Sequence, residues 1–262
     1  MTFVKAHALG NDFLLVEDTP ELLQTDHPAL ARRLCDRHRG IGADGAIFFS
    51  PRPDGAGMTL VNADGSASEV SGNGVRCLAA WLALQRGLAI GGSQRIYTDA
   101  GVKRLRLEAI DGPRLTFRAA MGAPEDVRQQ TLDVDGRPIQ AITLRVGNPQ
   151  CVVLGEVSDA RLHGLAARLA VHAAFPAGSN VELAAVEGPE RVRILIWERG
   201  VGPTEASGTG ACAAAVAAAT YGGASRDVQV VSPGGSQRVE WHDDELYLTG
   251  WAEVIGEGRW LL

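Results

Sequence analysis

The chain has 262 residues, of which 45% are apolar and 21% charged, and its formal net charge is -6. A chain of this size and composition buries a sizeable core and forms one or two domains. The acidic balance and the absence of a Lys/Arg run argue against nucleic acid and membranes as partners and favour a small polar ligand. The longest uncharged apolar stretch, Ala211–Thr220, is shorter than the roughly 20 residues that a bilayer needs. Since no secretory signal precedes Gly10, we expect a cytoplasmic protein.

The cysteines are Cys35, Cys77, Cys151 and Cys212. They are widely separated and form no C-x-x-C pair, which is typical of reduced thiols rather than of a disulfide framework or a zinc site. We therefore expect no metal site.

Strand patterns dominate the chain, at Phe3–Ala6, Phe13–Val16, Ala46–Phe49, Met58–Val61, Val102–Leu107, Arg114–Arg118, Ala141–Arg145, Val152–Leu154 and Val192–Trp197. Helical periodicity is confined to Pro28–Asp36, Gly74–Leu84, Ala160–Val171 and Gly210–Ala219. The sequence therefore predicts the α/β (α+β) class, with several strands and a helix in each half. The Gly/Pro-marked segment Ala119–Pro124 is the natural boundary between the halves.

A glycine cassette occurs twice, as Ser71-Gly72-Asn73-Gly74 and as Ser207-Gly208-Thr209-Gly210. Each copy follows a polar turn that begins nine residues earlier, at Asn62 or at Glu198, and each runs into good helix formers. A Gly-rich turn at a helix N-terminus gathers unpaired N–H groups and the positive end of the helix dipole, which makes it an anion site. Two such sites facing one another would hold one carboxylate in the cleft between the halves.

Asparagines beside other turn residues form a second pattern, at Asn11, Asn62, Asn73, Asn148 and Asn180. Any one of them is explained by the preference of Asn for turns. Their interleaving with the cassettes favours a further role, because an amide offers uncharged donors and acceptors that suit both ends of a zwitterion.

With these motifs assembled, the whole chain resembles the diaminopimelate epimerases, which are cofactor-independent amino-acid epimerases of bacterial lysine and cell-wall synthesis. The resemblance runs through Phe3–Phe13, Gly40–Gly45, Asn62–Ser66, Gly72–Cys77, Thr98–Gly101, Gly147–Pro149, Gly178–Glu182, Glu198–Thr204, Gly208–Cys212 and Pro233–Gly235. An ordered series of this length is a far more specific signal than one G-x-G motif.

The resemblance implies two pseudo-symmetric halves, each a β-barrel-like sheet around a central helix, with the active site between them. On that basis the first half spans 1–118 and is joined by a returning strand at 251–262, and the second half spans 119–250. The resemblance also implies an isomerase that needs no cofactor and acts on a small-molecule amino acid; we leave a homodimer open as its assembly.

Residue roles follow from the matching motifs. The resemblance assigns the substrate's distal amino-acid end and flanking polar atoms to Asn11, Asn62, Asn148 and Asn180. It assigns the reacting carboxylate to Gly72, Asn73, Gly208 and Thr209. Glu198 and Arg199 would add complementary charge, while we interpret Asp64 as a turn residue.

The chain departs from the family at the two catalytic positions, which are cysteines in the family and Ser71 and Ser207 here. A thiol has a pKa near ~8.5 and is readily tuned to a thiolate, whereas an aliphatic hydroxyl needs an adjacent base. Cys77 and Cys212 lie further into the expected helices, and we interpret them as small buried residues. A third departure is Gln150, where the family usually has a His that tunes the thiol pair, since Gln does not titrate.

Three explanations of the serines stay open: deliberate replacement of both cysteines in an ordinary epimerase, natural divergence to another reaction or substrate, and a binding protein without catalysis. Two identical one-atom changes in an otherwise complete set favour the first, while Gln150 favours the second. Proline and hydroxyproline racemases or dehydratases and the phenazine-pathway isomerase share the expected fold. Their substrates lack a second amino-acid end, so they should not need the complete set of asparagines.

Overall fold

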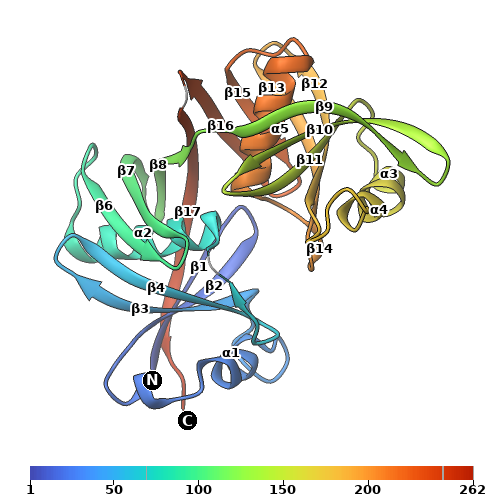
Figure 1. Ribbon diagram of the computed structural model, residues 1–262. Coiled ribbons are helices and arrows are strands. Elements are labelled where there is room, and N and C mark those ends of the chain that lie inside the picture. The colour runs from blue at the N-terminus through green and yellow to red at the C-terminus, as the bar shows by residue number, and fades with distance from the viewer. Residues whose placement is uncertain (69, 244, 262) are drawn as a thin grey trace. The chain divides into compact units, whose positions relative to one another are not determined.

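The computed structural model describes residues 1–68, 70–243 and 245–261. The chain divides into two compact units, one of Met1–Ala119 with Gly250–Leu262 and the other of Ala120–Thr249 (Figure 1). Each unit combines a β-sheet with helices, so the predicted class and the two similar halves are confirmed.

The elements of the first unit are β1 (Thr2–Ala8), β2 (Asn11–Glu17), η1 (Leu22–Gln24), α1 (His27–Cys35), β3 (Gly45–Arg52), β4 (Gly55–Asn62), β5 (Ala67–Ser68), α2 (Gly72–Arg86), β6 (Ser93–Thr98), β7 (Gly101–Asp111) and β8 (Arg114–Gly122). The second unit contains β9 (Glu125–Val134), β10 (Arg137–Val146), β11 (Asn148–Leu154), α3 (Asp159–Arg161), the π-helical turn η2 (Leu162–Ala166), α4 (Ala167–Ala170), β12 (Asn180–Gly188), β13 (Arg191–Glu198), β14 (Gly202–Thr204), α5 (Gly208–Tyr221), β15 (Asp227–Ser232) and β16 (Gly235–His242). The last strand, β17 (Glu245–Arg259), contributes residues to both units.

The duplication extends from the cassettes to the pairing of the strands. In the first unit β17, β1, β2, β3, β4, β6, β7 and β8 pair in that order, and β8 closes the ring onto β17. In the second unit β9, β10, β11, β12, β13, β15, β16 and β17 pair in that order. Both rows run through the same succession of antiparallel and parallel pairs, so β2, β3 and β4 correspond to β11, β12 and β13.

A helix lies against the inner face of the sheet in each unit. α2 packs on β1, β2, β4, β6 and β7, and α5 on β10, β11, β12, β13, β15 and β16 (Figure 1). Because strands surround α5, its residues from Gly210 to Ala218 are all buried, and six of these nine are alanines. Small side chains allow this close approach on every side, whereas larger ones would overpack the core.

The β1–β2 turn places a non-glycine residue in the left-handed region. Leu9 has φ 56° and the following Gly10 has φ 84°, as a two-residue turn between twisted strands requires. This conformation costs a leucine roughly 1–2 kcal/mol. The Leu9 side chain is fully buried, so core packing holds the turn in the shape that starts β2 at Asn11.

Predicted and observed elements agree at the two central helices and differ at several strands. The sequence patterns omitted β5, β6, β9, β12, β14, β15 and β16, and β17 was expected only from the family resemblance. The first residues of β9 are polar and exposed on both faces, so that part shows no alternation. β15 does alternate, with Val228 and Val230 buried, and leaving it out was wrong.

No helix in the described part of the chain is both long and apolar enough to cross a membrane.

We predict that Leu78→Ala on α2 lowers the free energy of unfolding by about 2–5 kcal/mol, because Leu78 is fully buried in the core of the first unit. Leu84→Ala is the matched control, since Leu84 lies on the same helix with 40% of its surface exposed. Urea unfolding followed by circular dichroism measures both. Equal losses for the two variants would contradict this packing of α2.

Candidate functional site

Ser71 and Ser207 are equivalent caps of the two central helices. Ser71 precedes α2 in an extended conformation, and its hydroxyl accepts a hydrogen bond from the Gly74 N–H at 3.2 Å. Ser207 does the same for α5 and the Gly210 N–H, also at 3.2 Å. The first N–H groups of each helix have no partner within the helix. Each cassette can therefore bind an anion with backbone groups.

The last glycine of each cassette is required by the sheet beneath it. A Cβ on Gly74 would lie 3.0 Å from Cδ1 of Ile47, and a Cβ on Gly210 would lie 2.6 Å from Oε1 of Glu182. Ile47 on β3 and Glu182 on β12 hold the same register position, because each pairs with the middle of the next strand, at Leu60 and at Ile196. The glycines thus let both helices start close to the sheet.

In the first unit the structure brings Asn11 and Asn73 together. The Asn73 amide donates to Oδ1 of Asn11 at 3.3 Å, and Asn11 donates to Asp44 at 2.9 Å. The buried Arg76 guanidinium donates to Oδ1 of Asn73. The Asn73 side chain is therefore fixed beside the first turn of α2.

A charged cluster supports the strand that begins at Asn11. Asp12 accepts from Lys5 at 2.5 Å and from Arg37 at 2.9 Å, and Arg37 also donates to Asp44 at 2.7 Å. Burial alone would raise the pKa of Asp12, but the hydrogen bonds from Arg37 and Lys5 prevail and lower that pKa to about 2. Asp12 is thus a carboxylate at neutral pH and ties β1, β2 and the segment before β3 together.

Asn62, a predicted site residue, forms a side-chain hydrogen bond within its own turn. Its amide donates to the Ser66 hydroxyl at 2.9 Å, and Asp64 accepts from both the N–H and the hydroxyl of Ser66. The interpretation of Asp64 as a turn residue is confirmed.

In the second unit one network joins the cassette to two strands. The Ser207 hydroxyl lies 3.4 Å from the Thr209 hydroxyl. Burial raises the pKa of Glu198 above its usual value, and the nearby Ser207 hydroxyl opposes that rise. Glu198 is therefore a carboxyl beside a hydroxyl, which is the arrangement of a base and its donor.

Gln150 extends this network. Its amide lies 2.6 Å from the Asn148 side chain. With its nitrogen toward Glu182, it donates to Oε1 at 3.0 Å and Oε2 at 3.3 Å, and its oxygen accepts from Thr209 at 3.1 Å. This orientation gives both ends of the buried amide a partner when the Asn148 amide is also turned, so that its nitrogen faces the Gln150 oxygen.

Asn180 and Arg199 meet at the ends of β12 and β13. Oδ1 of Asn180 accepts from the Arg199 N–H at 2.9 Å, and the Arg199 guanidinium donates to the Ala177 carbonyl at 2.9 Å. Arg199 also lines a cavity of about 290 Å³ with Phe175 and Trp197. No hydrogen bond recorded among the described residues links this pair to Ser207.

The sequence reasoning did not select Glu182, whose side chain is completely buried. Its position in a run of otherwise small and apolar residues, Val181-Glu182-Leu183-Ala184-Ala185, was the available signal. Burial and the charge of Glu198 raise the pKa of Glu182 well above its usual value.

The buried cysteines offer no substitute for the missing thiols. All four are free and buried, which agrees with the interpretation of Cys77 and Cys212 as small buried residues. Burial raises the pKa of the Cys77 thiol to about 12, and Cys212 is fully buried inside α5. A thiol that is neutral at physiological pH is a poor proton acceptor.

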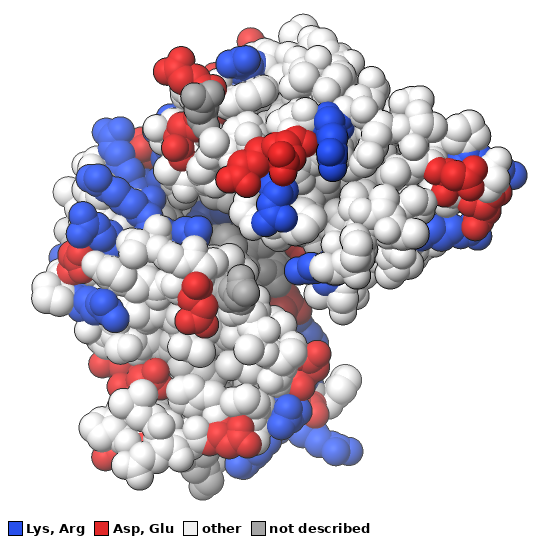
Figure 2. Space-filling model, viewed as in Figure 1, with Lys and Arg blue, Asp and Glu red and all other residues white. Residues whose placement is uncertain are grey.

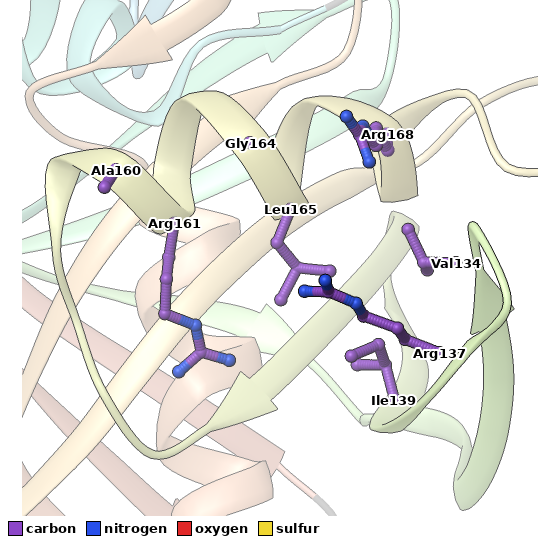
Figure 3. Close-up of a pocket in the computed structure, with 8 residues that line it drawn as sticks. All are labelled: Val134, Arg137, Ile139, Ala160, Arg161, Gly164, Leu165 and Arg168. Carbon is purple, nitrogen blue, oxygen red and sulfur yellow. The ribbon is translucent and has the colours of Figure 1, made fainter.

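Another pocket, of about 310 Å³, lies between the β9–β10 hairpin and α3–α4 and contains no predicted site residue (Figure 3). Arg137, Arg161 and Arg168 line it. Arg161 donates to the Glu156 carbonyl and Arg168 pairs with Asp135, so internal partners account for two of the three guanidinium groups.

Basic side chains also gather over β6 and β7 of the first unit (Figure 2). Among them, Arg95 pairs with Asp54 at 3.0 Å and Arg106 with Glu108 at 3.7 Å. Local pairing neutralises part of this charge, and no predicted site residue lies on these two strands.

The chain was compared with known proteins. The family model of diaminopimelate epimerase matches residues 3–127 and 142–255. The diaminopimelate epimerase of Desulforudis audaxviator is 41% identical over 278 residues, which cover 100% of this chain and 99% of the relative. That of Moorella thermoacetica is 39% identical over 98% of both chains, and the chloroplastic enzyme of Oryza sativa subsp. japonica is 37% identical over 98% of this chain and 79% of its own.

Solved structures share the fold at low sequence identity. A probable proline racemase from Agrobacterium radiobacter K84 has a TM-score of 0.75 at 16% identity and covers 100% of this chain and 93% of its own. A hydroxyproline epimerase from Agrobacterium vitis has a TM-score of 0.69 at 15% identity, with coverage of 98% and 90%. A Bacillus anthracis protein of the PhzF family has a TM-score of 0.74 at 14% identity and covers 100% and 99%.

We predict that Asp12→Asn destabilises the protein by roughly 2 kcal/mol at neutral pH, because the folded pKa of about 2 lies below the ordinary 3.8. A carboxyl with a lowered pKa stabilises above its unfolded pKa and loses that contribution as the pH falls through the folded value. The difference in the free energy of unfolding between wild type and variant should therefore shrink below about pH 4. Denaturant unfolding across this range measures it, with the exposed Asp111→Asn as the control. A loss of unfolding free energy that does not change with pH would contradict the lowered pKa of Asp12.

Proposed function

The chain belongs to the diaminopimelate epimerase family, and we propose that it binds LL- or meso-2,6-diaminopimelate but does not interconvert the two at an appreciable rate. The observation that carries the proposal is the equivalence of the two cassettes. Both helices begin with the same serine cap at the same 3.2 Å, while the polar residues around them are retained.

We propose that the two cassettes act together on one substrate carboxylate. The N–H groups at Gly72, Asn73, Gly208 and Thr209 would face this carboxylate. The positive ends of both helices would then stabilise the charge that delocalises into it as the α-proton leaves. No cofactor is needed for this stabilisation.

Asn11, Asn62, Asn148, Asn180 and Arg199 would recognise the second amino-acid end and the flanking polar atoms. Asn11 is held by Asp44, and Asn180 by the Arg199 backbone, so their remaining polar atoms are preorganised. A ligand with one amino-acid end would leave part of this set without a partner, which costs affinity.

Inversion at the α-carbon needs a base on one face and an acid on the other. In this chain the Ser207 hydroxyl lies near the Glu198 carboxyl. The Ser71 hydroxyl accepts from Gly74, and no carboxyl or imidazole partner is recorded for it among the described residues. Among the residues that the structure describes, the Ser71 hydroxyl therefore has no adjacent base, and we propose that the two-base reaction lacks one of its proton carriers.

A divergent amino-acid isomerase is the second candidate, and Gln150 is the observation in its favour. Gln150 contacts Glu182 and Thr209 through an amide, whereas the family usually has a titratable His there. Proline and hydroxyproline are the probes for this candidate, because they lack a second amino-acid end.

We predict that diaminopimelate binds at least about tenfold more tightly than proline or hydroxyproline, because each lost charged hydrogen bond costs a tenfold factor or more. Isothermal titration calorimetry measures the affinities. Proton NMR in D₂O should show no enzyme-dependent loss of the α-proton signal. Rapid exchange by the protein with both serines would refute the proposed inactivity, and tighter binding of proline would favour the divergent isomerase.

We predict that Ser71→Cys combined with Ser207→Cys accelerates epimerisation by at least about 10²-fold, the usual contribution of a positioned acid–base group. The two single variants are the controls, since each leaves one face without a thiol and should not invert the centre. Circular dichroism of the product and α-proton exchange report the reaction. A double variant that binds diaminopimelate normally without turnover would show that the ancestral activity is not restored by thiols alone.

A further inference from the structure

Glu182 is a carboxyl enclosed by the second unit. Its side chain is 0% exposed, and Oε1 would lie 2.6 Å from a Cβ on Gly210, so the carboxyl sits directly beneath the first turn of α5. No Lys, Arg or His pairs with it among the described residues. A buried carboxylate without a cation is costly, which favours the neutral acid.

The groups facing Glu182 are known from each element packed against it. Gln150 lies on β11, Glu198 lies on β13, and Cys212 lies on α5, whereas Cys151 on β11 points to the other face of the sheet. Gln150 and Glu198 share the face of Glu182, since Gln150 is two residues before the partner Val152 and Glu198 two residues after the partner Ile196. None of these groups supplies a positive charge.

The first unit shows that the fold does not need a carboxyl at this position. Ile47 occupies it there, at 3.0 Å from a Cβ on Gly74. Phe13 holds the position of Gln150, because Phe13 pairs with Gly45 and Gln150 pairs with Asn180. Asn62 holds the position of Glu198, because Asn62 lies two residues after Leu60 and Glu198 lies two residues after Ile196. An apolar residue therefore satisfies the packing, and Glu182 marks a functional difference between the two units.

We propose that Glu182 is a positioning residue that controls ligand binding at the α5 cassette. As a neutral acid, Glu182 leaves the N-terminus of α5 available to a ligand carboxylate. As a carboxylate, Glu182 competes with the ligand for that helix N-terminus. This inference rests on the proposed binding of diaminopimelate. When the Glu182 carboxyl releases its proton to solvent, its negative charge lies against the positive end of α5. A second carboxylate at the same helix end is then repelled, whereas Ile47, which lies beneath the α2 cassette, does not ionise.

The test compares the affinity for meso-diaminopimelate of wild type and Glu182→Gln by calorimetry from about pH 6 to about pH 10. Wild-type affinity should fall at least about tenfold more than that of the variant across this range, because rising pH creates a negative charge at the N-terminus of α5 in the wild type but not in the variant. Ionisation of the ligand's amino groups affects both proteins equally and cancels. Glu187→Gln is the control, since Glu187 is an exposed residue of the same strand whose partners are Arg191 and Arg193.

An identical alkaline loss of affinity in wild type and Glu182→Gln would overturn the role of Glu182 and leave the proposed function intact. Absence of binding at every pH would instead refute the proposed function.

Thermal unfolding without ligand tests the proton on Glu182 independently. A carboxyl with a raised folded pKa destabilises the folded state increasingly as the pH rises above its ordinary 4.5. The stability of Glu182→Gln relative to wild type should therefore grow with pH above that value. A difference between the two that does not depend on pH would overturn the inference.

Discussion

The site depends on the enclosure of a helix N-terminus by a curved sheet. Both α2 and α5 begin at a serine hydroxyl that accepts one N–H and leaves the first backbone donors of the helix without partners in it. Close approach of helix and sheet requires Gly74 and Gly210. The same constraint therefore explains the small residues of the cassettes, the alanines of α5 and the position of the two proposed anion sites.

The two units share this frame and differ in what surrounds it. In the first unit a network of full charges, Lys5, Asp12, Arg37 and Asp44, holds the strand of Asn11, and apolar side chains lie under α2. In the second unit Gln150, Glu182 and Glu198 lie under α5, and none of these three side chains carries a positive charge. Duplication accounts for the common frame, and substitutions at a few inward-facing strand positions account for the chemical difference.

Replacing sulfur by oxygen at the caps changes acidity far more than shape. The hydroxyls of Ser71 and Ser207 remain good caps, which is a role that serine fills well. Proton transfer is different, because an alcohol needs a neighbouring base. The proposed loss of proton transfer is therefore compatible with intact serine caps at both helices.

The sequence by itself determined the features that act over a few residues: the serine caps, the central helices, most strands and the family. It did not reveal the contact of Glu182 with Gly210, the pairing of Gln150 with Glu182 and Thr209, or the fixing of Asp12 by Lys5 and Arg37. Local patterns report the period of a strand or the cap of a helix, because these depend on near neighbours. Whether a lone carboxyl in a strand faces solvent or a helix end depends on which strands pair beside it, and only the tertiary structure decided that.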